Sequence, residues 1–235
     1  MNHETIEKNV VLLAVLTAIA ISFGGIVEII PLMNQRSATE PSPGLKLRTP
    51  LEVAGRDVYL REGCYNCHSQ MIRSLAEEVL RYGPPSDAGE SVWDHPFQWG
   101  SKRTGPDLAR VGGRYSDEWH RIHLHNPRDL VPESNMPGYP WLASEMLDGD
   151  EVAAEMRALR RVGVPFTDSD IAAAPAAVAG KSKLDALIAF LQSLKLPQPQ
   201  QPPAAAAGDL PNAGAAPPAA ASAAGNAPVS EEHAQ

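Results

Sequence analysis

The residues Cys64, Tyr65, Asn66, Cys67 and His68 form the pattern Cys-x-x-Cys-His. Two thiols on one tight turn can add across the two vinyl groups of a haem, and the adjacent imidazole then lies under the iron as an axial ligand. A bare Cys-x-x-Cys also suits half of a zinc site or a redox-active dithiol. Zinc would need a second ligand pair, but Cys64 and Cys67 are the only cysteines, and no strand-rich pattern typical of a redox dithiol surrounds them. The pattern therefore predicts one covalently attached haem c with His68 as an iron ligand.

The composition limits the class of protein. A length of 235 residues allows one or two domains. The net charge of -8 argues against a nucleic-acid partner. The chain holds 22 Pro and 18 Gly, so part of its length is not expected to be packed core. Because the haem would use both cysteines, no disulfide is expected.

An apolar run near the N-terminus is long enough to cross a membrane. Residues 9–27 contain no charge and, as a helix, would span about 28 Å, close to the ~30 Å hydrocarbon core of a bilayer. A cleaved signal peptide is the alternative. However, the preceding segment 1–8 carries more acidic than basic residues, and the apolar character continues to Ile30. We therefore predict a cytoplasmic segment 1–8 followed by an uncleaved anchor at 9–33.

The haem sets the direction of this anchor. Haem c is attached outside the bacterial cytoplasm, so the C-terminal bulk is expected in the periplasm, tethered to the inner membrane by a single pass. Glu28, near the outer end of the run, would either reach water at the membrane surface or contact a neighbouring membrane subunit. Residues 34–48 contain Pro41, Pro43 and Gly44 and are predicted to form a linker without regular structure.

A helix is expected immediately before the cysteines. Thr49 suits its N-cap, Pro50 its first helical position, and Glu52 lies where it can close a capping box. Gly63 is expected to end the helix directly before Cys64. Such a helix would carry its C-terminus to the haem attachment turn.

A second amphipathic helix is predicted from its cap Ser182 to Lys195. Helices at both ends of a haem segment resemble the class I cytochrome c fold, in which the first and last helices cross and pack. The sequence from Thr104 to Leu108 is similar to the Gly-Pro-x-Leu element of that fold. The resemblance implies that the carbonyl of Pro106 accepts the Nδ1 proton of His68, which would fix the ring and raise its basicity. An ordinary Gly-Pro turn is the alternative.

The sixth ligand of the iron should be a methionine or a histidine. Met136 lies in a proline-bracketed loop without helical periodicity, as the thioether does in class I cytochromes. Met71 is too close to His68 in sequence to reach the opposite face of the haem. Met146 and Met156 lie in stretches with helical spacing and are expected in the core. Met136 is therefore the predicted ligand.

Three histidines compete with this methionine. His120, His123 and His125 cluster on a short helix that we expect between its cap Ser116 and its stop Pro127. Each is interpreted as a surface or packing histidine. The choice matters because a His/His haem would have a lower potential than a His/Met haem, since the thioether favours Fe(II).

Basic residues surround the Gly-Pro element: Lys102, Arg103, Arg110 and Arg114. Charge-assisted hydrogen bonds from one of them could pair a haem propionate, and Arg103 is the candidate that we assign. A solvated basic face is the alternative.

The remaining chain completes an all-α prediction. Residues 150–162 are expected to form a helix ended by Gly163, and residues 167–170 resemble a capping motif ahead of an Ala-rich turn. Residues 49–196 would then form a class I cytochrome c-like haem domain. The tail 197–235, rich in Pro and Ala, cannot offset its ordering entropy by burial and is expected to be disordered.

Longer motifs are similar to one family, the membrane-anchored mono-haem subunit of cbb3-type cytochrome c oxidases. They are residues 99–113, 115–120 and 132–142 and the anchor segment 24–28. The resemblance covers roughly residues 5–196, and the tail lies outside it.

The resemblance implies a role in electron transfer. The subunit would pass electrons from a dihaem subunit of the same complex, or from another c-type cytochrome, to the haem–copper catalytic subunit that reduces oxygen. It would do no bond chemistry itself, so the enzyme activity would belong to the complex. Ser101 matches a serine that, in the family, contacts a calcium ion shared with the catalytic subunit, although one hydroxyl is a poor calcium site by itself. A free-standing, membrane-anchored electron shuttle is the alternative function, and a haem-based sensor is disfavoured because no output domain is seen.

Overall fold

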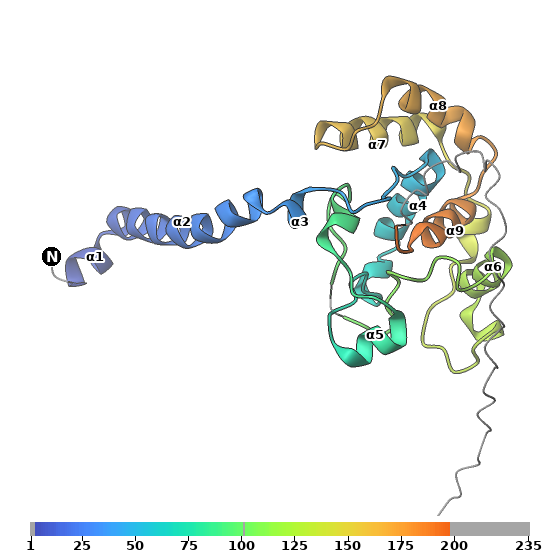
Figure 1. Ribbon diagram of the computed structural model, residues 1–235, viewed down its shortest axis with the longest axis horizontal. Coiled ribbons are helices and arrows are strands. Elements are labelled where there is room, and N and C mark those ends of the chain that lie inside the picture. The colour runs from blue at the N-terminus through green and yellow to red at the C-terminus, as the bar shows by residue number, and fades with distance from the viewer. Residues whose placement is uncertain (1–2, 101, 198–235) are drawn as a thin grey trace, which may run out of the picture. The chain divides into compact units, whose positions relative to one another are not determined.

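The computed structural model describes residues 3–100 and 102–197, and the regular structure of this part of the chain is helical (Figure 1). The predicted all-α fold is therefore confirmed, with one isolated antiparallel bridge between Met146 and Ser182. Most of the predicted tail lies outside the described residues. The α-helices are α1 (His3–Lys8), α2 (Val10–Asn34), α3 (Arg36–Thr39), α4 (Pro50–Arg61), α5 (Ala76–Tyr82), α6 (Asp117–His125), α7 (Gly149–Arg161), α8 (Asp168–Val178) and α9 (Lys183–Ser193). The 3-10 turns are η1 (Cys64–Asn66), η2 (Ala88–Ser91), η3 (Pro127–Asp129) and η4 (Pro140–Ala143).

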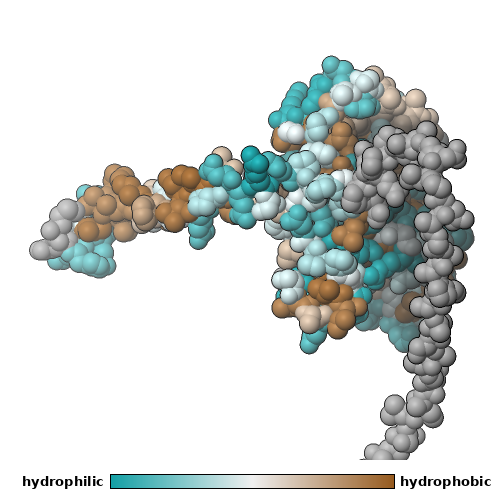
Figure 2. Space-filling view, viewed as in Figure 1, coloured by the Kyte–Doolittle hydropathy of each residue, from teal (hydrophilic) through white to brown (hydrophobic). Residues whose placement is uncertain are grey.

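Helix α2 has the length and composition of a membrane span. The side chain of its N-cap, Asn9, accepts a hydrogen bond from the amide of Leu12 at 3.0 Å. No residue of α2 is buried, and Figure 2 shows its hydrophobic side chains exposed along the helix. Within the described residues, it is the one helix that is long and apolar enough to cross a membrane.

Part of the predicted linker is helical, so the expectation of no regular structure there was wrong. Helix α3 takes up residues 36–39, and its first carbonyl accepts a hydrogen bond from the amide of Glu40 at 2.8 Å. Pro41 follows immediately and cannot donate the backbone hydrogen bond that would continue the helix.

Helices α4 and α9 pack directly against each other, as the class I cytochrome c resemblance implied. The capping box at Thr49 and Glu52 is confirmed, and a second box joins Ser182 to Asp185 at the start of α9. Helix α9 ends at Ser193, two residues before the predicted end. Two close contacts form the helix crossing: Gly55 lies against the backbone of Ala186, and the rings of Tyr59 and Phe190 are 5.3 Å apart.

Replacing Gly55 by valine is expected to destabilise the fold. A Cβ at this position would lie 1.9 Å from the carbonyl oxygen of Ala186, so α4 and α9 would have to separate. Overpacking of this kind costs about 1–3 kcal/mol or more. Chemical unfolding of the full chain in detergent measures the loss. The control is Ala172→Val, which introduces the same residue at an exposed position of α8. Equal stabilities of the two variants would contradict the packing described here.

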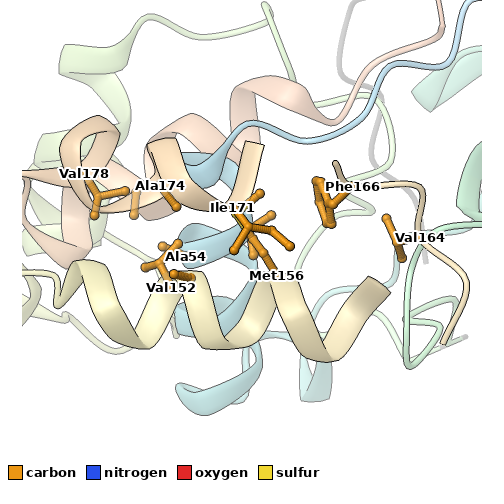
Figure 3. Packing of buried hydrophobic residues seen from close by; sticks show 11 residues of the cluster. Ala54, Val152, Met156, Val164, Phe166, Ile171, Ala174 and Val178 are labelled. Carbon is orange, nitrogen blue, oxygen red and sulfur yellow. The ribbon is translucent and has the colours of Figure 1, made fainter. Parts of the chain in front are cut away.

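A second part of the core lies between α7 and α8. Val152 and Met156 of α7 point towards Ile171 and Ala174 of α8, and Ala54 of α4 closes the cluster (Figure 3). The predicted Ala-rich turn is in fact the helix α8, because its capping box at Thr167 starts a helix whose apolar side chains are buried against α7.

The unfolding stability of this region is expected to depend on pH through Glu155 of α7. Burial is the main cause that raises the pKa of Glu155 to about 7, and the nearby Asp57 raises it further, against the effect of Arg61. Between pH 4.5 and about 7, the folded state therefore keeps the proton on Glu155. The unfolded chain, in which this carboxyl has its ordinary pKa of 4.5, releases it. The stability from this group is present below pH 4.5 and is lost as the pH rises to about 7.

Glu155→Gln should consequently be more stable than the parent chain at about pH 8, by on the order of 1–3 kcal/mol, and equally stable at about pH 4. Urea unfolding of the full chain at both pH values measures the difference. Glu118→Gln, at a side chain that is 74% exposed, is the matched control. Parallel pH profiles for all three proteins would contradict the prediction.

Candidate haem-binding site

A tight turn holds the two cysteines and the histidine together. After α4, Gly63 adopts a left-handed conformation with φ +71°, as the sequence predicted for the end of this helix. The chain then turns through η1, and the amides of Cys67 and His68 both donate to the carbonyl of Cys64, at 3.2 and 3.0 Å. Both thiols and the imidazole therefore lie on one compact turn.

The environment of Cys64 is apolar. Its side chain is half-buried, and burial raises the pKa of the Cys64 thiol to about 12, with Glu62 as a smaller cause. A redox-active dithiol needs a thiolate of lowered pKa, so this environment argues against that alternative. Cys67 is exposed.

The ring of His68 is held in one orientation. Its Nδ1 lies 2.7 Å from the carbonyl oxygen of Pro106, as the Gly-Pro resemblance implied. Because a carbonyl can only accept, Nδ1 carries the proton and Nε2 keeps its lone pair for a metal. Gly105 packs against the ring face, where a Cβ would lie 2.3 Å from Cε1 of the histidine. The hydroxyl of Tyr59, a buried α4 residue, donates to the backbone carbonyl of His68 at 3.4 Å.

Met136 belongs to the same apolar cluster as Cys64. Both side chains pack against the hydrophobic core that Val58, Leu124 and Leu142 help to form, and Leu108 of the Gly-Pro element packs there too. The loop of Met136 is fixed by a hydrogen bond from the amide of Tyr139 to the carbonyl of Leu124 at 2.8 Å, and by the close approach of Gly138 to the carbonyl of His125. Three segments that are far apart in sequence therefore meet at one place.

Met146 and Met156, the two methionines expected in the core, differ in burial. Met156 is fully buried between α7 and α8, as predicted. Met146 was expected in the core, and this was wrong. It forms the isolated bridge with Ser182, and it is 56% exposed.

The histidines of α6 have distinct environments. His120 is buried, as a packing histidine should be, and His125 is exposed. His123 stacks on Trp119 with ring centroids 4.5 Å apart. Burial is the main cause that lowers the pKa of His123, and the neighbouring His120 and His68 lower it further. Sequence reasoning did not distinguish the environments of the three histidines, because they depend on where α6 packs.

The guanidinium of Arg103 is already engaged by protein groups. Its Nε donates to the hydroxyl of Ser69 at 2.7 Å, and its Nη2 donates to the Glu78 carboxylate and to the carbonyl of Met71, both at 2.8 Å. A contact with a haem propionate, as the sequence suggested, would have to use Nη1. Arg103 and Arg73 also hold the pKa of Glu78 well below its usual range.

The candidate calcium contact cannot be located, because Ser101 lies outside the described residues. In the part of the chain that the structure describes, no group of three or more His, Cys, Asp and Glu side chains could hold a metal ion.

Comparison with known proteins gives one family. The model of the family described as cytochrome c oxidase, mono-haem subunit/FixO, matches residues 3–196. Comparison with curated proteins gave no match.

Proposed function

The chain belongs to the FixO family of mono-haem cytochrome c oxidase subunits, and on this premise we propose that it is the electron-transfer subunit of a cbb3-type oxidase. In this proposal the chain receives electrons from a dihaem subunit of the same complex or from another c-type cytochrome. It passes them to the haem–copper subunit, which reduces oxygen. The observation that carries the proposal is the meeting of the cysteine turn, the Gly-Pro element and the Met136 loop at one apolar cluster.

The residues at this cluster fit a haem c. Cys64 and Cys67 would form the two thioether bonds, and Nε2 of His68 and the thioether of Met136 would be the axial ligands. The fit rests on the protonated Nδ1 of His68, which leaves Nε2 for the iron, and on Gly105, where a side chain would collide with the ring. When bound, the haem supplies a centre that accepts and releases one electron.

The protein residues set the properties of that centre. The Pro106 carbonyl accepts a hydrogen bond from Nδ1 of His68, which would make the imidazole a more basic ligand, whereas the soft sulfur of Met136 would favour Fe(II). Leu108 and Tyr139, packed with Cys64, would limit the access of water to the iron. A thioether ligand in place of a second imidazole would raise the potential, which suits a donor to an oxygen-reducing partner.

Helix α2 would anchor this domain in the bacterial inner membrane, with the haem in the periplasm where haem c is attached. The proposed partners are the haem–copper subunit and the dihaem subunit. A shared calcium ion would contact Ser101, and most of its oxygen ligands would have to come from the catalytic subunit, because calcium takes six to eight.

The linker favours a fixed subunit over the alternative, a free-standing electron shuttle. The amide of Ser42 donates to the carbonyl of Gly89 at 3.0 Å, and the Ser42 hydroxyl donates to Asp87 at 3.1 Å. Further along, Nη2 of Arg48 donates to both carboxylate oxygens of Asp94, at 2.8 and 3.1 Å. A shuttle needs a long and mobile linker so that its haem domain can move between partners. A linker that is bonded to the haem domain at both Ser42 and Arg48 allows little such movement.

Blue-native electrophoresis of solubilised membranes with haem staining tests the proposal. In the native first dimension this chain should migrate in a large, copper-containing band. The denaturing second dimension should resolve that band into this haem-stained chain and two further subunits. A haem-stained chain that migrates alone would instead support the shuttle.

A further inference from the structure

The backbone on either side of His68 is hydrogen-bonded to the Gly-Pro element. The amide of Gly105 donates to the carbonyl of Cys67 at 3.0 Å. The amide of Leu108 donates to the carbonyl of Ser69 at 2.9 Å. Between these two bonds, the imidazole meets the carbonyl of Pro106. The position of that carbonyl therefore depends on how firmly the two segments are held together.

The carboxylate of Asp107 joins the same two segments a second time. Its Oδ2 accepts from the hydroxyl of Ser69 at 2.6 Å and from the amide of Met71 at 3.0 Å, both just after the histidine. Its Oδ1 accepts from the amide of Ala109 at 2.8 Å, within its own loop. The residue is 6% exposed, so these bonds are shielded from water.

Arg103 supplies the positive charge that a buried carboxylate requires. Its Nη2 lies 3.3 Å from Oδ2 of Asp107, and its Nε donates to the same Ser69 hydroxyl that donates to the carboxylate. The carboxylate of Glu78 also accepts a hydrogen bond from Nη2, at 2.8 Å. Removing one member of such a network leaves a buried polar group or charge without its partner, so the remaining groups must move.

We propose that Asp107 and Ser69, held by Arg103, are positioning residues that keep the Pro106 carbonyl on Nδ1 of His68 and thereby tune the reduction potential of the haem. This inference rests on the proposed function, because it assumes that His68 binds the iron. A firmly held acceptor makes the imidazole more basic and favours Fe(III). Loosening the network should weaken this bond, make the imidazole less basic and raise the potential.

The test uses the full chain, loaded with haem and purified in detergent. Asp107→Asn removes the charge and weakens the network, and Ser69→Ala removes one hydroxyl without changing any charge. Two quantities are measured for each variant: the midpoint potential from a redox titration of the haem absorbance, and the exchange rate of the His68 Nδ1 proton in the reduced protein by NMR. Both variants should have a higher potential. Their exchange rate should increase about tenfold, the factor that corresponds to the free energy of roughly one hydrogen bond.

Asp168→Asn is the matched control, because it makes the same change of charge at a side chain that is 94% exposed and paired with Arg160. It should leave both quantities unchanged. The Ser69→Ala result separates positioning from electrostatics, since a purely electrostatic role of the carboxylate would shift the potential in Asp107→Asn alone.

Unchanged proton exchange in Ser69→Ala would overturn the proposal, whatever Asp107→Asn does to the potential. If Asp107→Asn fails to fold, Ser69→Ala still decides. Haem staining of the denatured parent chain distinguishes the two levels of inference. A parent chain without haem refutes the proposed function, whereas a stained chain whose variants exchange normally refutes only the positioning role.

Discussion

Replacing Cys64 and Cys67 together by serine is expected to remove all haem staining from the denatured chain. In the proposed site, the two thioethers are the only covalent links to the haem, whereas His68 and Met136 release it when the protein unfolds. Each single variant keeps one thioether and should stain, although more weakly than the parent. The measurement is peroxidase staining of haem after denaturing electrophoresis, with the amount of chain determined by immunoblot.

Met136→Ala provides the control for this experiment, since loss of an axial ligand should leave the covalent staining in place. A double cysteine variant that stains like the parent chain would show that the haem is attached elsewhere or that the stain has another source.

Met136→Ala is also expected to lower the midpoint potential by on the order of 100 mV, within the ~0.8 V range that axial ligands cover. The soft thioether stabilises Fe(II), and a water or a nitrogen ligand in its place does so less. The open position should also bind carbon monoxide, which the parent protein should exclude. Redox titration and the absorbance change on adding carbon monoxide to the reduced protein measure both effects.

Two further variants identify the ligand if the prediction fails. Met146→Ala removes an exposed methionine and should change neither quantity. His123→Ala tests the competing histidine that stacks on Trp119 in α6. An unchanged spectrum in Met136→Ala together with a new carbon monoxide complex in His123→Ala would assign the sixth ligand to His123 instead.

The parts of the fold that sequence predicted best depend on local chemistry. Thr49 and Ser182 cap α4 and α9 through capping boxes. In such a box, the hydroxyl of the cap and the carboxylate three residues later each accept a hydrogen bond from a backbone amide that the helix leaves free. Gly63 ends the first of these helices because few other residues adopt its left-handed conformation. Such rules need no knowledge of distant segments.

The parts that sequence did not predict depend on tertiary contacts. Arg103 was read as a candidate partner of a propionate, but its bonds to Glu78 and Ser69 join segments that are 25 and 34 residues away. The buried carboxylate of Asp107 stands inside the recognised Gly-Pro element, so that motif was a signal for its position but not for its partners. Met146 has the spacing of a core residue, yet it lies before the start of α7 and is exposed.

The central claim, that one haem is covalently attached at the cysteine turn, is tested most directly by the intact mass of the chain purified from membranes and then denatured. We predict the mass of the polypeptide plus one haem, with proteolysis locating the added mass on the peptide that contains Cys64 and Cys67. A denatured chain with the mass of the polypeptide alone, or with the haem on another peptide, would contradict it.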